Sequence, residues 1–600
     1  MSATALSAAD LLAEAAAALE RGRHAEAETM CRKLLAARPD HGRTLHLLGL
    51  ALSGQGRHAD ALASFERAVA VKPDYHQAYS NRGNTLRDLG RNEEALASYD
   101  RALTIKPDYA SARYNRANLL QALGRQGDAL ADFDAAIALR PDFAAAHSNR
   151  SLALQALGRM AEALASCDRA IALAPDLAAA HVNRGTALHR LRRFGDALAA
   201  FDRALQIEPS LADALHARAL TLHELKRYDE ALASCERALA AGARNTDSFY
   251  LRGTLLHVMN HGADARASYA AALSVQPDRA ELALAACMAE LPILYAGATE
   301  IDERRSAYER RLRALTARFG GANAAALAPA IGAHQPFFLA YQGRNDRELQ
   351  ALYGALVCGA AAAARGPAAV TTLAGHGEKI RVGLVSGFFH QHSNWKVPIK
   401  GWLERLDRDR FRLFGYHTSE KQDAATRAAQ ALCERFVQGP LPIERWRAEI
   451  AADRPHVLIY PEVGMDRASA ALAAERLAPV QCNAWGHPDT SGFPTLDHYL
   501  SSDLMEPTDG QAHYTERLVR LPNLSIHYEP IDWKPTGVKR TDLGLREGAT
   551  VFWCGQSTFK FLPQYDDVFA RIARNAPDCQ FAFIDNPGAR QVTDRKSTRL

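Results

Sequence analysis

The chain has 600 residues, several times the length of an ordinary domain of about 100–200 residues, so we expect several domains. Its 72 basic and 68 acidic residues leave a net charge of only +4, which excludes the strongly basic composition typical of nucleic-acid-binding proteins. The 9 cysteines lie far apart with no CxxC pair, so we expect neither a zinc site nor a disulfide framework.

The amino-terminal segment is rich in alanine but carries acidic residues. Asp10, Glu14 and Glu20 interrupt it, so it lacks the basic flank and unbroken apolar core of a signal peptide. The sequence contains no run of about 18 apolar residues, which predicts no membrane span. We therefore expect a cytoplasmic protein whose partners include neither nucleic acid nor a membrane.

A period of 34 residues dominates the first half of the chain. This period is typical of tetratricopeptide repeats, in which each unit is a pair of antiparallel helices and a small residue lets the two helices pack closely. Eight such units fit residues 8–279, which predicts an α-solenoid, a tetratricopeptide superhelix. The repeated positions run from Arg23 to Arg227, from Pro39 to Pro209 and, for the small residue, from Ala27 to Ala265.

One position on the first helix of the repeats is asparagine in four consecutive units. An amide side chain both donates and accepts hydrogen bonds, so a row of them on the inner face can bind the backbone of an extended peptide. The alternative is that each asparagine merely bonds a neighbouring helix. We favour binding of a protein or peptide acceptor, because the row stops at Ala217. The four residues are Asn81, Asn115, Asn149 and Asn183.

The period is lost from about residue 280 to 375, where we expect a connecting helical segment. From residue 376, short β-rich runs alternate with helix-like stretches, which predicts a parallel sheet with helices on both faces. Ligands of such sheets bind beyond the carboxyl ends of the strands. The runs are KIRVGLVS, FRLFGYH, HVLIYPE, PVQCNAWG, HYLSSD and RLVRLP.

Histidines follow several of these runs. His390 and His392 come after the first run, and His487 lies in the turn HPDTSG after the fourth. An acidic residue, Glu462, follows the third run. A single loop histidine usually has a structural role, but several at one sheet edge favour proton transfer, for which imidazole suits neutral pH. The tight polar turn HPDTSG suits contact with phosphate or ribose.

The stretches VGLVSGFFHQHS, DRPHVLIY, APVQCNAWGHPDTSG and FKFLP resemble the catalytic region of protein O-linked N-acetylglucosamine transferases and their SPINDLY-like relatives. The resemblance covers about residues 379–590, and a tetratricopeptide array precedes this region in those families too. It implies two Rossmann-like α/β lobes, here 376–545 and 546–600, that bind a nucleotide sugar between them. It also implies inverting transfer of N-acetylglucosamine or a related sugar, from UDP-N-acetylglucosamine, to Ser or Thr of proteins, without a metal ion or other cofactor.

The resemblance also implies roles for individual residues. His392 and His456 match active-site histidines, and Asp453 precedes the second of them. Lys560 matches a lysine that binds the donor's phosphates, where an ammonium stabilises charge on the leaving group; the alternative is a solvated lysine. Either a histidine or a phosphate oxygen of the donor could accept the proton of the acceptor hydroxyl. Further donor contacts are expected from Gln556, His487, Thr490 and Ser491, the last three in a turn that stands where relatives carry GYP-type turns.

The second lobe begins near Val551, and a complete nucleotide-binding lobe needs about 100 residues more than the chain has beyond this point. We therefore expect a lobe that is incomplete at Leu600. Two alternative functions stay open. One is a tetratricopeptide adaptor for protein–protein interaction with an inactive catalytic remnant. The other keeps the fold and changes the sugar or acceptor, because SPINDLY-like relatives transfer fucose from GDP-fucose and others glycosylate Asn.

Overall fold

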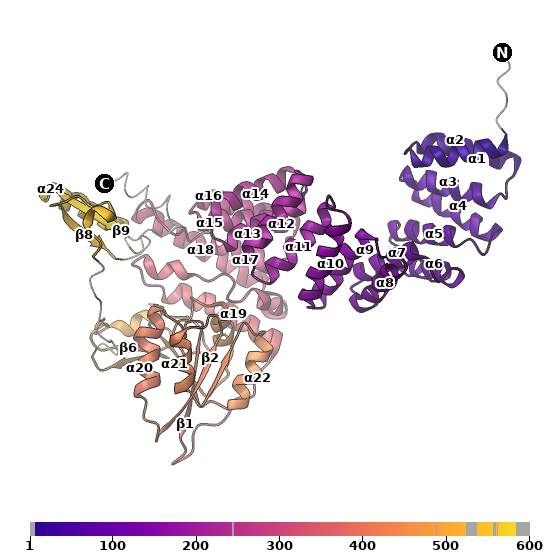
Figure 1. Cartoon of the computed structure of the whole chain (residues 1–600). Helices are drawn as coiled ribbons and strands as arrows, with labels where there is room; N and C mark the ends of the chain where they lie inside the picture. Colours follow the sequence, from indigo (N-terminus) through magenta and orange to yellow (C-terminus); the bar gives the residue numbers. More distant parts are fainter. Residues whose placement is uncertain are drawn as a thin grey trace. The chain divides into compact units, whose positions relative to one another are not determined.

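The computed structural model describes residues 7–242, 245–487, 489–523, 537–555, 560 and 562–583. It divides into two compact units, Met1–Ala243 and Arg244–Leu600 (Figure 1). The described part of the first unit consists of helices joined by short turns, in antiparallel pairs. These helices are α1 (Ala8–Glu20), α2 (His24–Ala37), α3 (Gly42–Gly54), α4 (His58–Val71), α5 (His76–Asp88), α6 (Asn92–Ile105), α7 (Ala110–Ala122), α8 (Gln126–Leu139), α9 (Ala144–Ala156), α10 (Met160–Leu173), α11 (Ala178–Arg190), α12 (Phe194–Ile207), α13 (Ala212–Glu224) and α14 (Tyr228–Ala240).

In several pairs a large side chain of the second helix packs against a small residue of the first. A Cβ atom on Gly185 of α11 would lie 2.6 Å from the Phe201 ring of α12, and a Cβ on Gly83 would lie equally close to the Tyr99 ring. The alanines that recur from Ala27 to Ala265 are fully buried. The predicted tetratricopeptide solenoid is therefore confirmed, together with the reason for its small residues.

A row of arginines links neighbouring repeats. Arg116 of α7 donates hydrogen bonds to Asp100 in the preceding repeat and to the buried Asp132 in its own. Three later arginines pair with an aspartate of the preceding repeat at the same spacing of 16 residues. These pairs are Arg150–Asp134, Arg184–Asp168 and Arg218–Asp202.

The turn between the two helices of a repeat contains one residue with left-handed backbone. Gly56 and Gly158 occupy this position with φ of +75°, where glycine lacks the steric penalty of a Cβ atom. Arg192 and Lys226 occupy it in later repeats, with φ of +58° and +59°. Asn260 does so in the eighth repeat, with φ of +61°, so the fold imposes a conformation that three of the later repeats adopt without glycine.

The second unit begins with the last helix pair, so the eighth repeat belongs to this unit. The Tyr250 hydroxyl lies 2.7 Å from Nε2 of His334 in the segment that we expected to be a connector. The buried carboxylate of Glu290 pairs with Arg304 and Arg311 of the next helix. The helices of this region are α15 (Thr246–Val258), α16 (Gly262–Val275), α17 (Ala280–Met288), α18 (Ala298–Arg318), η1 (Gly321–Ala330), η2 (Phe337–Tyr341) and α19 (Arg347–Arg365).

Seven parallel strands form the main sheet, in the order β3-β2-β1-β4-β5-β6-β7. The chain proceeds outward from β1 through β2 to β3, then returns to β4 on the other side of β1, so the topological switch point lies between β1 and β4. All six expected runs form strands, and β3 is an addition. The strands are β1 (Ile380–Ser386), β2 (Phe411–His417), β3 (Arg435–Gln438), β4 (Val457–Tyr460), β5 (Val480–Ala484), β6 (His498–Ser502) and β7 (Arg517–Leu521).

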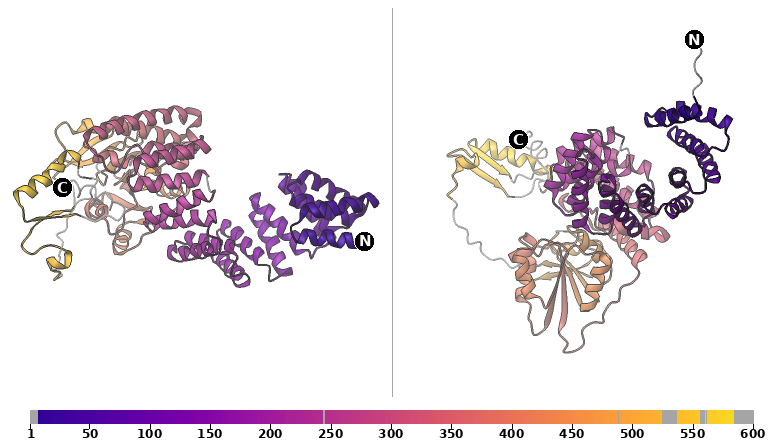
Figure 2. Two further views of the ribbon diagram at one scale, coloured as in Figure 1. Left: turned by 90° about the horizontal axis from the view of Figure 1, so that it is seen from above. Right: turned by 45° about the vertical axis from the view of Figure 1, so that its right-hand side comes forward.

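Helices cover both faces of this sheet (Figures 1 and 2). Val382 and Leu384 of β1 pack with residues of η3, α20 and α21, whereas Val385 belongs to the core shared with α22, α23 and α19. The predicted α/β class is therefore confirmed, and α19 of the expected connector is part of the same core. These helices are η3 (Trp395–Ile399), α20 (Lys400–Arg405), α21 (Ala424–Leu432), α22 (Ile443–Asp453) and α23 (Arg467–Ala473).

A second, two-stranded parallel sheet follows. It pairs β8 (Thr550–Cys554) with β9 (Cys579–Phe583), and α24 (Asp566–Asn575) lies between them in the sequence. The rings of Phe552, Phe569 and Phe581 pack together, with centroids 5.5 Å apart in two pairs. The strand β8 contains Val551, near which we expected the second lobe to begin. Within the described ranges, no helix is long and apolar enough to cross a membrane.

Candidate active site

Three strand ends meet at the carboxyl edge of the main sheet, at the switch point. Glu462, two residues after β4, accepts the backbone N–H of Gly387 after β1 at 3.1 Å. Asp466 accepts the hydroxyl of Thr418, which follows β2, at 2.9 Å. A Cβ atom on Gly387 would lie 3.1 Å from the Asp466 carboxyl group, so a glycine allows this close approach. Side-chain hydrogen bonds therefore hold the ends of β1, β2 and β4 together.

His392 lies in the loop after β1 and is half-buried. Its ring stacks on Phe388, with centroids 4.2 Å apart, and Nδ1 accepts the Asn394 N–H at 3.2 Å. Burial, together with the charges of His390 and Lys421, lowers the pKa of His392. The neutral ring, with Nδ1 accepting, carries its proton on Nε2. His392 can therefore donate a hydrogen bond to a ligand.

Two further histidines support this loop. The His390 ring lies 5.9 Å from that of His392 and 6.1 Å from that of His417. His417, at the end of β2, is fully buried. Its ring nitrogens lie 3.2 Å from the Ser386 carbonyl and 3.0 Å from the Lys421 carbonyl. His417 thus fixes the start of the loop that carries His390 and His392.

His456 and Asp453 lie at the opposite edge of the sheet. Nδ1 of His456 accepts the N–H of Arg381, the second residue of β1, at 3.0 Å. Asp453 accepts the Tyr416 hydroxyl at 2.9 Å and pairs with Arg435 at 2.6 Å. Because β1 and β4 are parallel, their starts lie far from the loop of His392. The structure does not bring these two residues to that loop, and their catalytic role stays a prediction of the resemblance.

The turn HPDTSG is bound to two other elements. The hydroxyls of Thr490 and Ser491 both donate to the buried Glu516, and the Ser491 N–H bonds the same carboxylate at 2.9 Å. Gly492 has φ of +72°, and a Cβ atom there would clash with the Gln350 carbonyl of α19. The two hydroxyls are therefore already engaged, and donor binding by Thr490 and Ser491 stays a prediction.

His487 and Lys560 both lie close to Tyr341 of η2. The buried His487 ring packs on Phe337 at 5.1 Å and on Tyr341 at 6.3 Å, and burial lowers the pKa of His487 to about 4. Nζ of the exposed Lys560 lies 5.6 Å from the centre of the Tyr341 ring. Both expected donor-binding residues thus lie close to Tyr341, and their roles stay predictions. Gln556 lies outside the described residues.

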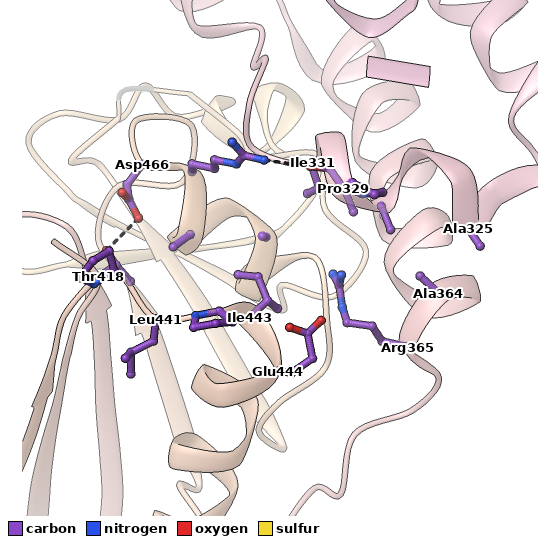
Figure 3. A pocket seen from close by; sticks show the side chains of 16 residues that line it. Ala325, Pro329, Ile331, Ala364, Arg365, Thr418, Leu441, Ile443, Glu444 and Asp466 are labelled. Atoms are coloured by element: carbon purple, nitrogen blue, oxygen red, sulfur yellow. Dashed lines mark hydrogen bonds between the residues drawn. The ribbon is translucent and has the colours of Figure 1, made fainter. Parts of the chain in front are cut away.

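A cavity of about 650 Å³ opens beside Asp466 (Figure 3). Thr418 and Asp466 form its wall nearest the strand ends, and Arg365 and Glu444 point into it from α19 and α22 (Figure 3). Its remaining lining is largely apolar. The volume is in the range of small-molecule sites, about 300–1,000 Å³.

The asparagine row of the first unit links successive repeats. Nδ2 of Asn149 donates to Tyr114 and Asn118, and Nδ2 of Asn183 donates to Ser148, in each case in the preceding repeat. Nδ2 of Asn81 lies 2.8 Å from the His46 ring, likewise one repeat earlier. These contacts favour the structural alternative for the amide nitrogens of three of the four residues. Acceptor binding by Asn81, Asn115, Asn149 and Asn183 stays a prediction.

Comparison with known proteins agrees with this architecture. Tetratricopeptide-repeat models match residues 6–74, 83–124, 114–178 and 182–246, and the model of glycosyl transferase family 41 matches residues 306–527. The family 41 match begins inside α18, so it includes α19 as well as the main sheet. This agrees with the shared core of α19 and the sheet.

Several curated proteins are similar to parts of the chain. The probable UDP-N-acetylglucosamine–peptide N-acetylglucosaminyltransferase SEC of Arabidopsis thaliana is 24% identical over 36% of this chain and 23% of its own length. The corresponding SPINDLY protein of that plant is 31% identical over 19% of this chain and 12% of its own. A UDP-glucose:protein N-β-glucosyltransferase of Actinobacillus pleuropneumoniae is 29% identical over 20% of this chain and 19% of its own. The chain spans less than a quarter of the length of these relatives.

Among solved structures, an O-GlcNAc transferase mutant of Thermobaculum terrenum superposes with a TM-score of 0.50. The similarity covers 70% of this chain and 72% of that one at 20% identity, which shows a shared fold. Tetratricopeptide-repeat models thus match the first part of the chain, and the model of glycosyl transferase family 41 matches residues 306–527 of the second.

Proposed function

We propose that the chain is an inverting glycosyltransferase that moves N-acetylglucosamine from UDP-N-acetylglucosamine to Ser or Thr of proteins, without a metal ion. The observation that carries the proposal is the family 41 match over residues 306–527. These residues include the main sheet and His392, which lies in the loop after β1, at the switch point. Ligands of open α/β sheets bind at such a point, outside the carboxyl ends of the strands. The names of the similar plant proteins supply the donor and the acceptor class.

In this proposal His392 orients the reacting groups. Its neutral ring, with Nδ1 accepting the Asn394 N–H, presents Nε2–H to an oxygen of the donor or acceptor. A ring in this tautomer has no free lone pair for the proton that leaves the acceptor hydroxyl. A phosphate oxygen of the donor then accepts that proton as the sugar transfers, which selects one of the two routes that the sequence left open.

Lys560 and His487 serve the donor side. The exposed ammonium of Lys560 lies 5.6 Å from the centre of the Tyr341 ring, on which the buried His487 ring also packs. Departure of the nucleoside diphosphate develops negative charge, which a fixed ammonium stabilises. The cavity beside Asp466 has room for part of a substrate at the same edge of the sheet.

The repeat array binds the protein acceptor in this proposal. The amide nitrogens of Asn81, Asn149 and Asn183 bond the preceding repeats, so their side-chain oxygens are the groups that would accept N–H donors from an extended peptide. Replacing these asparagines would also remove contacts between repeats, so acceptor use has to be judged against the stability of the array.

A second candidate keeps the fold and changes the sugar and the acceptor. The similarity to the Actinobacillus protein favours transfer of glucose from UDP-glucose to an amide nitrogen. The two candidates differ in the donor consumed and in the bond formed, since an O-linked product is cleaved by alkaline β-elimination and an N-linked product is not.

Substitution of His392 tests the proposal at its site. We expect His392→Ala to lower the transfer of label from UDP-N-acetylglucosamine into protein by at least about 100-fold, the lower end of what a positioned proton-transfer or hydrogen-bonding group contributes. His376→Ala is the matched control, because His376 is exposed ahead of β1, and it should transfer as the unchanged chain does. Full activity in a folded His392→Ala variant would refute the assignment.

Lys560→Ala is expected to reduce transfer through loss of charge stabilisation, and Lys560→Arg to restore part of it. The control is Lys539→Ala, which removes another exposed ammonium from the same part of the chain. If Lys539→Ala lowered the rate as much as Lys560→Ala does, a specific role for Lys560 would be wrong.

A further inference from the structure

Glu462 occupies the switch point itself. It lies two residues after β4, is fully buried, and accepts the N–H of Gly387 after β1 with Oε1. Its second oxygen, Oε2, is buried without a hydrogen-bond partner among the described residues. One side chain therefore links the segments that follow β1 and β4, the switch point at which ligands of open α/β sheets usually bind.

The surroundings of Glu462 disfavour a negative charge. The Ser386 hydroxyl and the Gly387 N–H stabilise the ionised carboxylate, but burial outweighs them and, with the nearby Asp466 carboxylate, raises the pKa of Glu462 to about 8. No ion pair with a basic side chain occurs for Glu462 in the described part of the chain. Asp466 in turn accepts the Thr418 hydroxyl, and a ring nitrogen of His417 lies 3.2 Å from the Ser386 carbonyl.

We propose that Glu462 is a positioning residue of the transferase: by accepting the Gly387 N–H it fixes that backbone, and through it the loop that carries His390 and His392. This inference rests on the proposed function. Ionisation would place a charge beside Asp466 in a site that lacks solvent and a basic partner. The carboxylate would then have to draw in water or move, and the Gly387 segment would move with it. Transfer should therefore fall as the pH rises through the range in which Glu462 loses its proton.

Thermal unfolding of the full chain tests the ionisation without using activity. The folded state holds the proton to about pH 8, whereas the unfolded chain releases it near pH 4.5, so this group destabilises the fold progressively between those values. Glu462→Gln keeps the shape and the accepting oxygen but cannot ionise. Its Tm relative to the unchanged chain should rise from pH 5 to pH 8 and then level off. Glu444→Gln, at an exposed glutamate of α22, should show no such trend. A constant difference for Glu462→Gln would overturn the inference.

The pH profile of transfer tests the positioning role. We expect the unchanged chain to lose activity above about pH 8 and Glu462→Gln to retain it to higher pH. Glu462→Ala, which lacks the oxygen that Gly387 uses, should be at least tenfold slower at every pH. If Glu462→Gln declines at the same pH as the unchanged chain, the positioning role is wrong. If the unchanged chain transfers no sugar at any pH, the proposed function fails, and the unfolding experiment still decides the state of Glu462.

Discussion

At the scale of single residues, two glycines determine how the turn HPDTSG packs on α19. A Cβ atom on Gly354 of α19 would clash with the Gly492 carbonyl, and one on Gly492 would clash with the Gln350 carbonyl. The backbones therefore touch directly, and Gly492 also has φ of +72°. Backbone atoms cannot move aside as the end of a flexible side chain can, so neither position accommodates a side chain.

We expect Gly492→Ala to destabilise the second unit by roughly 3 kcal/mol, from overpacking and from the left-handed conformation. Gly359→Ala is the control, because Gly359 lies in α19, the helix on which the turn packs, and a Cβ atom there would meet open space. That change should stabilise the helix by about 1 kcal/mol. Urea unfolding of both variants measures these differences, and equal stabilities would disprove the backbone contact.

The sequence predicted which residues cluster at the switch point better than it predicted their individual roles. His390, His392 and Glu462 were expected at strand ends, and they lie there because parallel strands end at one edge of a sheet. His456 precedes its strand, and that position places it at the other edge. The engagement of Thr490 and Ser491 by Glu516 could not be predicted, because the acid comes from a residue 25 positions later whose approach depends on the tertiary fold.

At the scale of elements, the turns of the repeats differ in how well their sequences suit them. The residue between the two helices is left-handed, with glycine in early repeats and Arg192 or Lys226 in later ones. A non-glycine residue has a steric cost of about 1–2 kcal/mol there. Glycine avoids this cost, but it loses more conformational freedom on folding, which offsets part of the gain.

Lys226→Gly should therefore stabilise the first unit by about 0.5–1 kcal/mol. The reciprocal change, Gly158→Ala, should destabilise the turn by a similar or larger amount, because φ at this position is +75°. Thermal unfolding of the repeat unit checks both changes. A lower Tm for Lys226→Gly would show that the lysine side chain contributes more than its backbone strain costs.

The order of helices and strands was largely predictable, because each has a clear period or a continuous apolar run. The strand β3 was not, since RFVQ has four residues, all half-buried, and pairs with β2 alone. The role of α19 was also missed. Nothing in its sequence distinguishes a helix that packs on the sheet from a connecting helix. In the structure several α19 side chains belong to the core of the sheet, among them Tyr353, which packs on Phe493.

At the scale of the whole molecule, the chain contains two parts of different kinds. The first unit stacks repeats through apolar contacts and a periodic row of ion pairs, so its surface is extended and regular. The second unit brings the eighth repeat, the helices that follow it and the main sheet into one compact body. The proposed reaction centre is local to the second unit, whereas proposed acceptor binding uses the first.

The central claim is the proposal that the region of this chain that matches glycosyl transferase family 41 transfers a sugar from a nucleotide to protein. The most direct measurement incubates the full chain with a total protein extract and labelled UDP-N-acetylglucosamine, UDP-glucose or GDP-fucose, and follows label in protein. We predict incorporation from UDP-N-acetylglucosamine, release of that label by alkaline β-elimination, and its loss with His392→Ala. Absence of label from all three donors would contradict the claim and favour a tetratricopeptide adaptor with an inactive catalytic region.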